Sequence, residues 1–129
     1  MLIRSQAQTP AQAMTMAGAD GVTMKLMLGR EQGAPNFAMR LFEVEPGGHT
    51  PRHQHNYEHE VMVLEGAGQV LGNRGGSSIR PIAAGDAVLI PANEEHQFRN
   101  PGDRPLKFLC LVPVRYDCGS GRCEATPGS

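Results

Sequence analysis

The sequence predicts an all-β domain, an antiparallel sandwich of jelly-roll type closed into a small barrel. Apolar and polar residues alternate in many runs of about four to ten residues, the pattern of half-buried strands. The 129 residues include 16 glycines and 10 prolines, spread along the chain as the turns between short strands require. No stretch shows the 3.6-residue period of a long amphipathic helix.

The length fits one compact domain and is too short for two. Residues 1–20 are small and polar with weak periodicity, so we expect an N-terminal arm or edge strand there. The β-barrel domain is expected over residues 21–115. The Gly-rich polar segment 116–129 is expected to be a flexible C-terminal tail.

Four strands are expected in the first half of the domain. Residues 22–28 alternate, and a turn follows them. Residues 36–46 form a longer alternating run that ends at Pro-Gly-Gly. Residues 50–55 and 58–65 complete the set, separated by an Asn-Tyr turn.

Shorter strands are expected in the second half. Residues 69–71 lead into a Gly-rich hairpin loop, and residues 79–82 follow it. Residues 87–90 and 96–100 flank a polar turn that begins with proline. Residues 106–114 form the last strong apolar run.

Charge and cysteine content limit the function classes. The formal net charge is −1 with acids and bases interspersed, which predicts no nucleic-acid or membrane partner. No apolar run is long enough to span a bilayer, and no signal peptide is recognised. Three cysteines predict a reducing, cytoplasmic location. Cys118 and Cys123 could form a disulfide or a second metal site, but a solvated tail is favoured.

Four of the five histidines lie in the stretch PGGHTPRHQHNYEHEVMVLEGAG, residues 46–68. His53 and His55 are two residues apart, which on a strand places both imidazoles on one face. Taken alone, the pair also fits two exposed polar residues. His59 and Glu60 are adjacent, so only one of them can share that face.

The fifth histidine, His96, lies in a second block, GDAVLIPANEEHQFRN. It follows a tight turn between two strands, which can direct a ligand toward a site built on another hairpin. A single histidine there is also compatible with a structural role.

The two blocks together resemble the two motifs of the cupin superfamily. Gly47 is followed after five residues by His53-x-His55, and three further residues reach His59, where cupins usually have Glu. Six more reach Gly66. The alternative, Glu60, leaves only five. The second motif is spaced correctly across Gly85, Pro91, Asn93, His96 and Asn100, with Asn93 replacing a glycine. Asn tolerates the left-handed backbone that such a turn needs.

The resemblance implies a double-stranded β-helix, the cupin barrel, and extends to small single-domain manganese cupins with four histidine ligands. Over residues 20–114 it implies His53, His55, His59 and His96 as ligands of one divalent metal. Manganese is expected from the resemblance alone, because imidazoles also suit Fe, Ni, Cu and Zn. Four neutral ligands on a six-coordinate ion leave two positions for substrate or dioxygen.

Strand parity and the resemblance suggest the lining of a substrate pocket. Phe98 lies two residues after His96, and Val61 shares the side of His59. The resemblance suggests that Phe108, Cys110 and Arg40 reach the same pocket. The alternatives are core packing for the phenylalanines, a small buried thiol for Cys110 and an arginine extending to an edge.

Three functions remain open from sequence. The first is a metal-dependent, dioxygenase-type oxidoreductase acting on a small organic molecule. The second is a non-redox isomerase or lyase that uses the ion as a Lewis acid. The third is a non-catalytic module that binds a sugar or another metabolite. Fold does not decide between them. A homodimer is expected from the resemblance.

Overall fold

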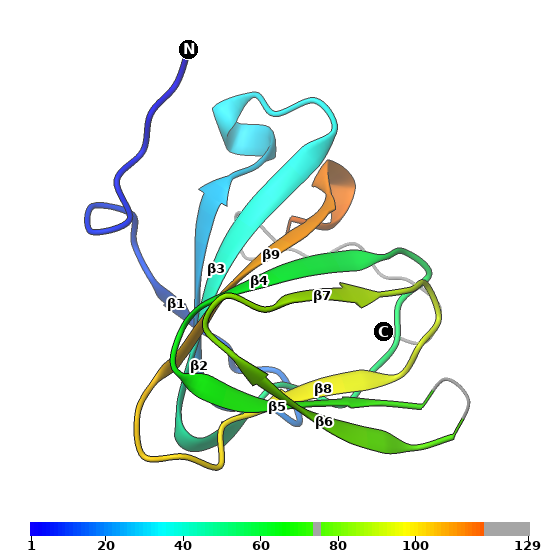
Figure 1. Cartoon of the computed structure of the whole chain (residues 1–129). Helices are drawn as coiled ribbons and strands as arrows, with labels where there is room; N and C mark the ends of the chain where they lie inside the picture. Colours follow the sequence, from blue (N-terminus) through cyan, green and yellow to red (C-terminus); the bar gives the residue numbers. More distant parts are fainter. Residues whose placement is uncertain (74–75, 118–129) are drawn as a thin grey trace.

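The computed structural model describes residues 1–73 and 76–117 as an all-β structure (Figure 1). The described residues form nine strands and two short 3-10 helices. In chain order these are β1 (Gln12–Ala13), β2 (Asp20–Leu28), η1 (Arg30–Gln32), β3 (Phe37–His49), β4 (His59–Glu65), β5 (Ala67–Gly72), β6 (Ser78–Ala83), β7 (Ala87–Ile90), β8 (His96–Arg99), β9 (Leu106–Pro113) and η2 (Val114–Tyr116).

The strands pair antiparallel in one curled sheet, in the order β6-β5-β8-β3-β9-β4-β7. β2 pairs with β3, and the short β1 pairs with β2. β3 pairs with both β2 and β9 along its length, and at its end His49 lies opposite Arg99 of β8. The long β3 therefore connects the two walls of the barrel, which confirms the predicted fold class.

The left-handed turn expected in the second motif is present. Asn93 has φ of 69° and is the non-glycine residue with positive φ among the described residues. Gly85, which opens this motif, has φ of 97°, and Gly47, which opens the first, has φ of 82°. These conformations explain why glycine or asparagine occupies the three positions.

Two predicted strand boundaries were wrong. The expected strand over 50–55 is irregular, because Pro51 has no N–H to donate and interrupts the ladder. Only His53 forms an isolated bridge there, to His96. The strand expected over residues 36–46 does not end at Pro46 but continues to His49. Asp20 of β2 lies opposite His49, and the residues of β3 before His49 bulge out instead of turning away.

The inward faces of the strands form one hydrophobic core. Ala38, Arg40, Phe42 and Val44 of β3 are all buried, because alternate residues of a strand share one face. Aromatic rings stack through the centre, with ring centroids 5.3 Å apart for Phe42 and Phe108. The other core residues are apolar side chains from β2, β4–β9: Val22, Met24, Leu26, Val61, Val63, Val70, Ile82, Ile90, Phe98, Leu106, Cys110 and Val112.

The last described residue, Asp117, lies inside the segment that was expected to be a flexible tail. Tyr116 packs on the core and Asp117 is fully buried, although the tail was expected to begin at residue 116. Cys118 and Cys123 lie outside the described residues. Within the described ranges, no helix is long and apolar enough to cross a membrane.

Candidate metal centre

The four motif histidines come from three segments that meet at one end of the barrel. His53 and His55 lie on the irregular segment after β3, His59 begins β4, and His96 begins β8. His53 and His96 are held side by side by two main-chain hydrogen bonds: His53 N–H donates to the His96 carbonyl at 3.2 Å, and His96 N–H donates back at 2.9 Å. The backbone therefore fixes one residue of each motif next to the other.

Three of the histidines are close enough to bind one ion. The ligand nitrogens of His53, His55 and His96 all lie within 4.8 Å of one another. The Nε2 atoms of His53 and His55 are 3.2 Å apart. This convergence of nitrogens from both motifs is the arrangement that a shared cation requires.

His59 borders this three-histidine group. Its ring centroid is 5.0 Å from the ring of His55 and 5.0 Å from that of His96. Its Nδ1 lies 3.1 Å from Sγ of Cys110, whereas its Nε2 is buried without a hydrogen-bond partner in the described structure. A buried polar atom of this kind costs about 1–3 kcal/mol, so an unsatisfied nitrogen at this position requires an explanation.

Hydrogen bonds select which nitrogen of His96 can bind metal. Its Nδ1 lies 2.8 Å from the carbonyl oxygen of Glu94. Because a carbonyl can only accept, Nδ1 carries the hydrogen and Nε2 keeps its lone pair. In metal sites of proteins, a hydrogen bond from the ring nitrogen that does not bind the metal orients the imidazole.

All four imidazoles favour the neutral form, which is the form that binds metals. Burial, with smaller effects of His96 and Arg40, lowers the pKa of His53 to about 4. Burial and the neighbouring histidines lower the pKa of His55 to about 3. Burial, followed by the charge of Arg40, lowers the pKa of His59 to about 2. Burial also lowers the pKa of His96, against the opposing effect of Glu94.

The donor set fits a divalent transition metal. The cluster offers imidazole nitrogens and no carboxylate, a set that suits Mn, Fe, Ni, Cu or Zn and is poor for Ca or Mg. Such an ion, when bound, would supply Lewis acidity and open coordination positions.

Of the five residues expected to line a pocket, two contact one another beside His59 and three lie in the core. Arg40 is buried, and its Nη2 lies 3.5 Å from Sγ of Cys110, which also contacts His59. Phe98 and Phe108 stack at 4.6 Å, and Val61 is buried in the core. The structure therefore links Arg40 and Cys110 to a motif histidine and shows the other three as core residues.

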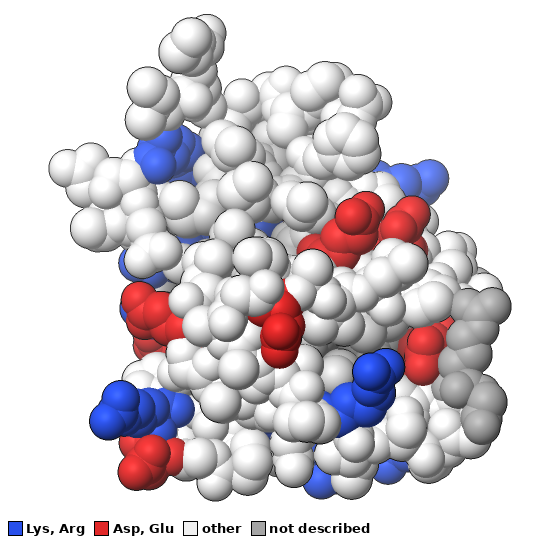
Figure 2. All heavy atoms as spheres, viewed as in Figure 1, with Lys and Arg blue, Asp and Glu red and all other residues white. Residues whose placement is uncertain are grey.

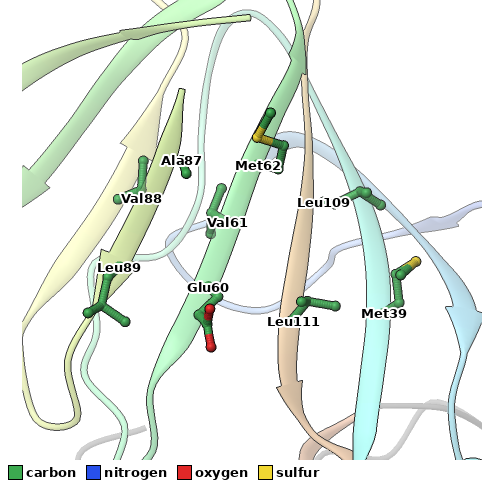
Figure 3. Close-up of a pocket in the computed structure, with 9 residues that line it drawn as sticks. All are labelled: Met39, Glu60, Val61, Met62, Ala87, Val88, Leu89, Leu109 and Leu111. Carbon is green, nitrogen blue, oxygen red and sulfur yellow. The ribbon is translucent and has the colours of Figure 1, made fainter. Parts of the chain in front are cut away.

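A separate hollow lies on the opposite, outer face of the sheet (Figure 3). It has a volume of about 350 Å³. Glu60 lines it and is exposed, whereas the adjacent His59 is buried in the barrel. The predicted opposite orientation of these two neighbours is confirmed. The remaining lining residues are mostly apolar: Met39, Val61, Met62, Ala87, Val88, Leu89, Leu109 and Leu111.

Sequence reasoning missed an aromatic residue of the site. Tyr57 was expected only to mark a turn, but its ring stacks on His55 with centroids 4.8 Å apart and lies 5.3 Å from the ring of His59. Burial raises the pKa of Tyr57 to about 12. Its position between two candidate ligands in the sequence is a signal that could have identified it.

Comparison with known proteins gives one family match and several relatives. The family model described as "Cupin domain" matches residues 40–112. A 1-methylthio-D-xylulose 5-phosphate methylsulfurylase from Rhodospirillum rubrum is 43% identical over 79 residues, 61% of this chain and 49% of that protein. This chain thus spans about half the length of that relative. An oxalate-binding protein from Thermotoga maritima is 33% identical, covering 87% of this chain and 93% of that protein.

Solved structures agree with the fold. A polyketide cyclase from Streptomyces resistomycificus superposes with a TM-score of 0.83 at 31% identity, covering 88% of this chain and 80% of that one. A cupin-2 domain protein from Rhodospirillum rubrum gives a TM-score of 0.72 at 32% identity, covering 88% and 74%. The names of these relatives span enzymes of different reaction types and a binding protein.

Proposed function

The chain belongs to the cupin domain family, and from this premise we propose that it holds one divalent transition metal through His53, His55, His59 and His96. The observation that carries this proposal is the meeting of imidazole nitrogens from both motifs, with three of them within 4.8 Å of one another. The Nε2 of His59 is buried and has no hydrogen-bond partner within residues 1–73 and 76–117, which supports its inclusion as the fourth ligand. Manganese is the metal proposed first, with Fe, Ni, Zn and Cu as the alternatives to be tested.

We further propose a metal-dependent, dioxygenase-type oxidation of a small organic molecule. Four neutral ligands leave the ion two positions for a substrate and dioxygen. Phe98, Phe108 and Val61 are buried apolar side chains, and we propose that they face the ion, where they suit a small, partly apolar substrate. Arg40 is a buried cation on β3 and lies opposite Cys110 of β9. Its guanidinium supports the binding of an oxygen-rich anionic group.

A second candidate is non-catalytic binding of a small oxygen-rich anion. Two observations favour it: the buried Arg40 close to the histidine cluster, and the oxalate-binding protein that matches most of this chain. A non-redox isomerase or lyase is a third outcome, since the relatives include enzymes of several reaction types.

The deciding experiment begins with the metal-stripped protein titrated separately with Mn²⁺, Fe²⁺, Ni²⁺, Cu²⁺ and Zn²⁺. The best-bound metal is then used for dioxygen-uptake assays with small aromatic and diketone substrates, and for calorimetric titration with oxalate. Dioxygen uptake with turnover supports the dioxygenase-type proposal. Stoichiometric oxalate binding without turnover supports the second candidate. No binding of any metal refutes the metal site and the oxidation proposed for it.

We also propose that two copies associate through the outer face of β4, β7 and β9. Met62, Leu89 and Leu111 are exposed there around the hollow described above. Charges of both signs are scattered over the face in view, with uncharged surface between them (Figure 2). Light scattering is expected to show a dimer that Leu89→Asp converts to a monomer. Ile79→Asp, at an exposed position on β6, is the matched control and should remain dimeric.

A further inference from the structure

Three aromatic rings form a stack that leads from the histidine site to the C-terminal segment. The rings of His55 and Tyr57 are 4.8 Å apart with an interplanar angle of 14°. The rings of Tyr57 and Tyr116 are 3.9 Å apart at 9°. Tyr57 therefore lies between a candidate metal ligand and a residue of η2, and both of its faces are in contact with another ring.

The segment that carries Tyr116 is attached to the connection between β2 and β3. The N–H of Val114 donates to the carbonyl of Asn36 at 3.0 Å. The buried carboxylate of Asp117 accepts the backbone N–H of Arg30 at 2.8 Å, and its other oxygen lies 3.1 Å from Nη2 of the same residue. Figure 1 shows η2, in orange, after the end of β9. Tyr116 is thus held between two attached ends.

The attachment depends on a close approach of the backbone. A Cβ atom placed on Gly29 would lie 2.6 Å from Oδ2 of Asp117, which is closer than real Cβ atoms come to other heavy atoms. Glycine at this position lets the carboxylate reach the backbone at the start of η1. The segment also lies beyond residue 112, where the match to the family model ends.

We propose that residues 114–117 form a strap that presses Tyr57 against His55 and thereby slows the exchange of metal and ligands at the histidine site. The proposal rests on the proposed function, because the strap acts on a bound ion. Tyr116 is a positioning residue: it contacts Tyr57, and Tyr57 contacts His55 and His59. Without Tyr116, one face of Tyr57 is uncovered and its ring gains freedom to move away from the two imidazoles.

The chain contains its own reporter for this stack. It has two tyrosines and no tryptophan. Those two tyrosines are Tyr57 and Tyr116, so the tyrosine bands of the near-ultraviolet circular dichroism and of the fluorescence come from the stacked pair alone. A change in the stack can be measured without a label.

The test compares release of Co²⁺ from the loaded full-length protein into excess EDTA, together with the tyrosine signals. Tyr116→Ala is expected to release Co²⁺ roughly 2- to 12-fold faster than wild type, the range set by one aromatic contact. Tyr116→Phe keeps the ring and should release at the wild-type rate. Ile79→Ala, an exposed truncation on β6, is the control for a general loss of stability. Co²⁺ binding should alter the tyrosine signal of the wild type.

A second variant covers the case in which Tyr116→Ala does not fold. Asp117→Asn retains both tyrosines but weakens the attachment to Arg30, and it should also accelerate release and diminish the tyrosine dichroism. Equal release rates in the wild type and in whichever of these two variants folds would overturn the strap, while leaving the metal site intact. A wild-type protein that binds neither Co²⁺ nor any of the five metals named above would overturn both the proposed function and the strap.

Discussion

Replacing His59 with leucine should make the metal-free protein more stable and the metal-loaded protein less stable than wild type. His59 is 6% exposed, and its Nε2 is buried without a hydrogen-bond partner among the residues that the structure describes. Such an atom costs about 1–3 kcal/mol, and leucine removes it with a side chain of similar size. The substitution also loses the contact with Sγ of Cys110, worth about 1 kcal/mol. The net expectation is a gain of about 1 kcal/mol, or roughly 3–5 °C in Tm.

Bound metal should make the wild type more stable than His59→Leu, the reverse of the order without metal. An ion present at about 100 times its Kd stabilises the wild type by about 2.7 kcal/mol. Loss of a ligand should weaken binding by at least about 100-fold, since loss of an outer partner alone costs 10–100-fold. At the same metal concentration the variant then gains only about 0.4 kcal/mol. The wild type becomes the more stable protein.

The assay is denaturant unfolding followed by far-ultraviolet circular dichroism, with and without Mn²⁺. Glu60→Gln is the matched control, because Glu60 is the exposed neighbour on the other face of β4. It should resemble wild type in both conditions. The reasoning about His59 is refuted if the variant and wild type keep the same order with and without metal, or if Glu60→Gln is the variant that loses the metal effect.

Three further outcomes follow from the structure. The folded-state pKa values of His53 and His55 are lowered to about 4 and about 3, so the unfolded chain binds more protons between about pH 3 and 6.5. The stability of the metal-free protein should therefore fall as the pH drops through that window, and metal binding should weaken as the imidazoles become protonated. Unfolding at several pH values and metal titrations check both expectations. Asn100→Ala removes buried side-chain hydrogen bonds to three backbone groups and should cost about 2–4 kcal/mol in chemical denaturation, and a cost below 1 kcal/mol would contradict this. Gly29→Ala should displace Asp117 and reduce the tyrosine dichroism, and an unchanged spectrum would show that the backbone adapts.

The sequence predicted most of the fold because local patterns determine most of it. Alternation located β2, apolar runs bounded by glycine or proline located β4 and β7, and the second motif predicted the left-handed Asn93. The failures have a physical cause. The segment 50–55 has an extended pattern, but Pro51 prevents a regular ladder, and the Pro-Gly-Gly sequence makes a bulge inside β3 where a turn was expected.

The candidate site was predicted in part. Motif spacing brought His53, His55 and His96 together, and the structure places their nitrogens near one another. The stacking of Tyr116 on Tyr57 could not be predicted, because the two residues are far apart in sequence and neither belongs to a motif. Contacts of this kind depend on the path of the chain in space, which spacing rules do not describe.

The main sheet path ends at β6 and β7, and these two strands expose backbone edges to which another strand could pair. β6 carries Arg80 and Pro81 at exposed positions, and proline offers no N–H to an incoming strand. β7 has only four residues and is followed by Pro91. Short, charged or proline-containing borders are the features by which natural sheets resist the addition of a foreign strand. These features of β6 and β7 oppose the addition of a foreign strand at the two ends of the main sheet path.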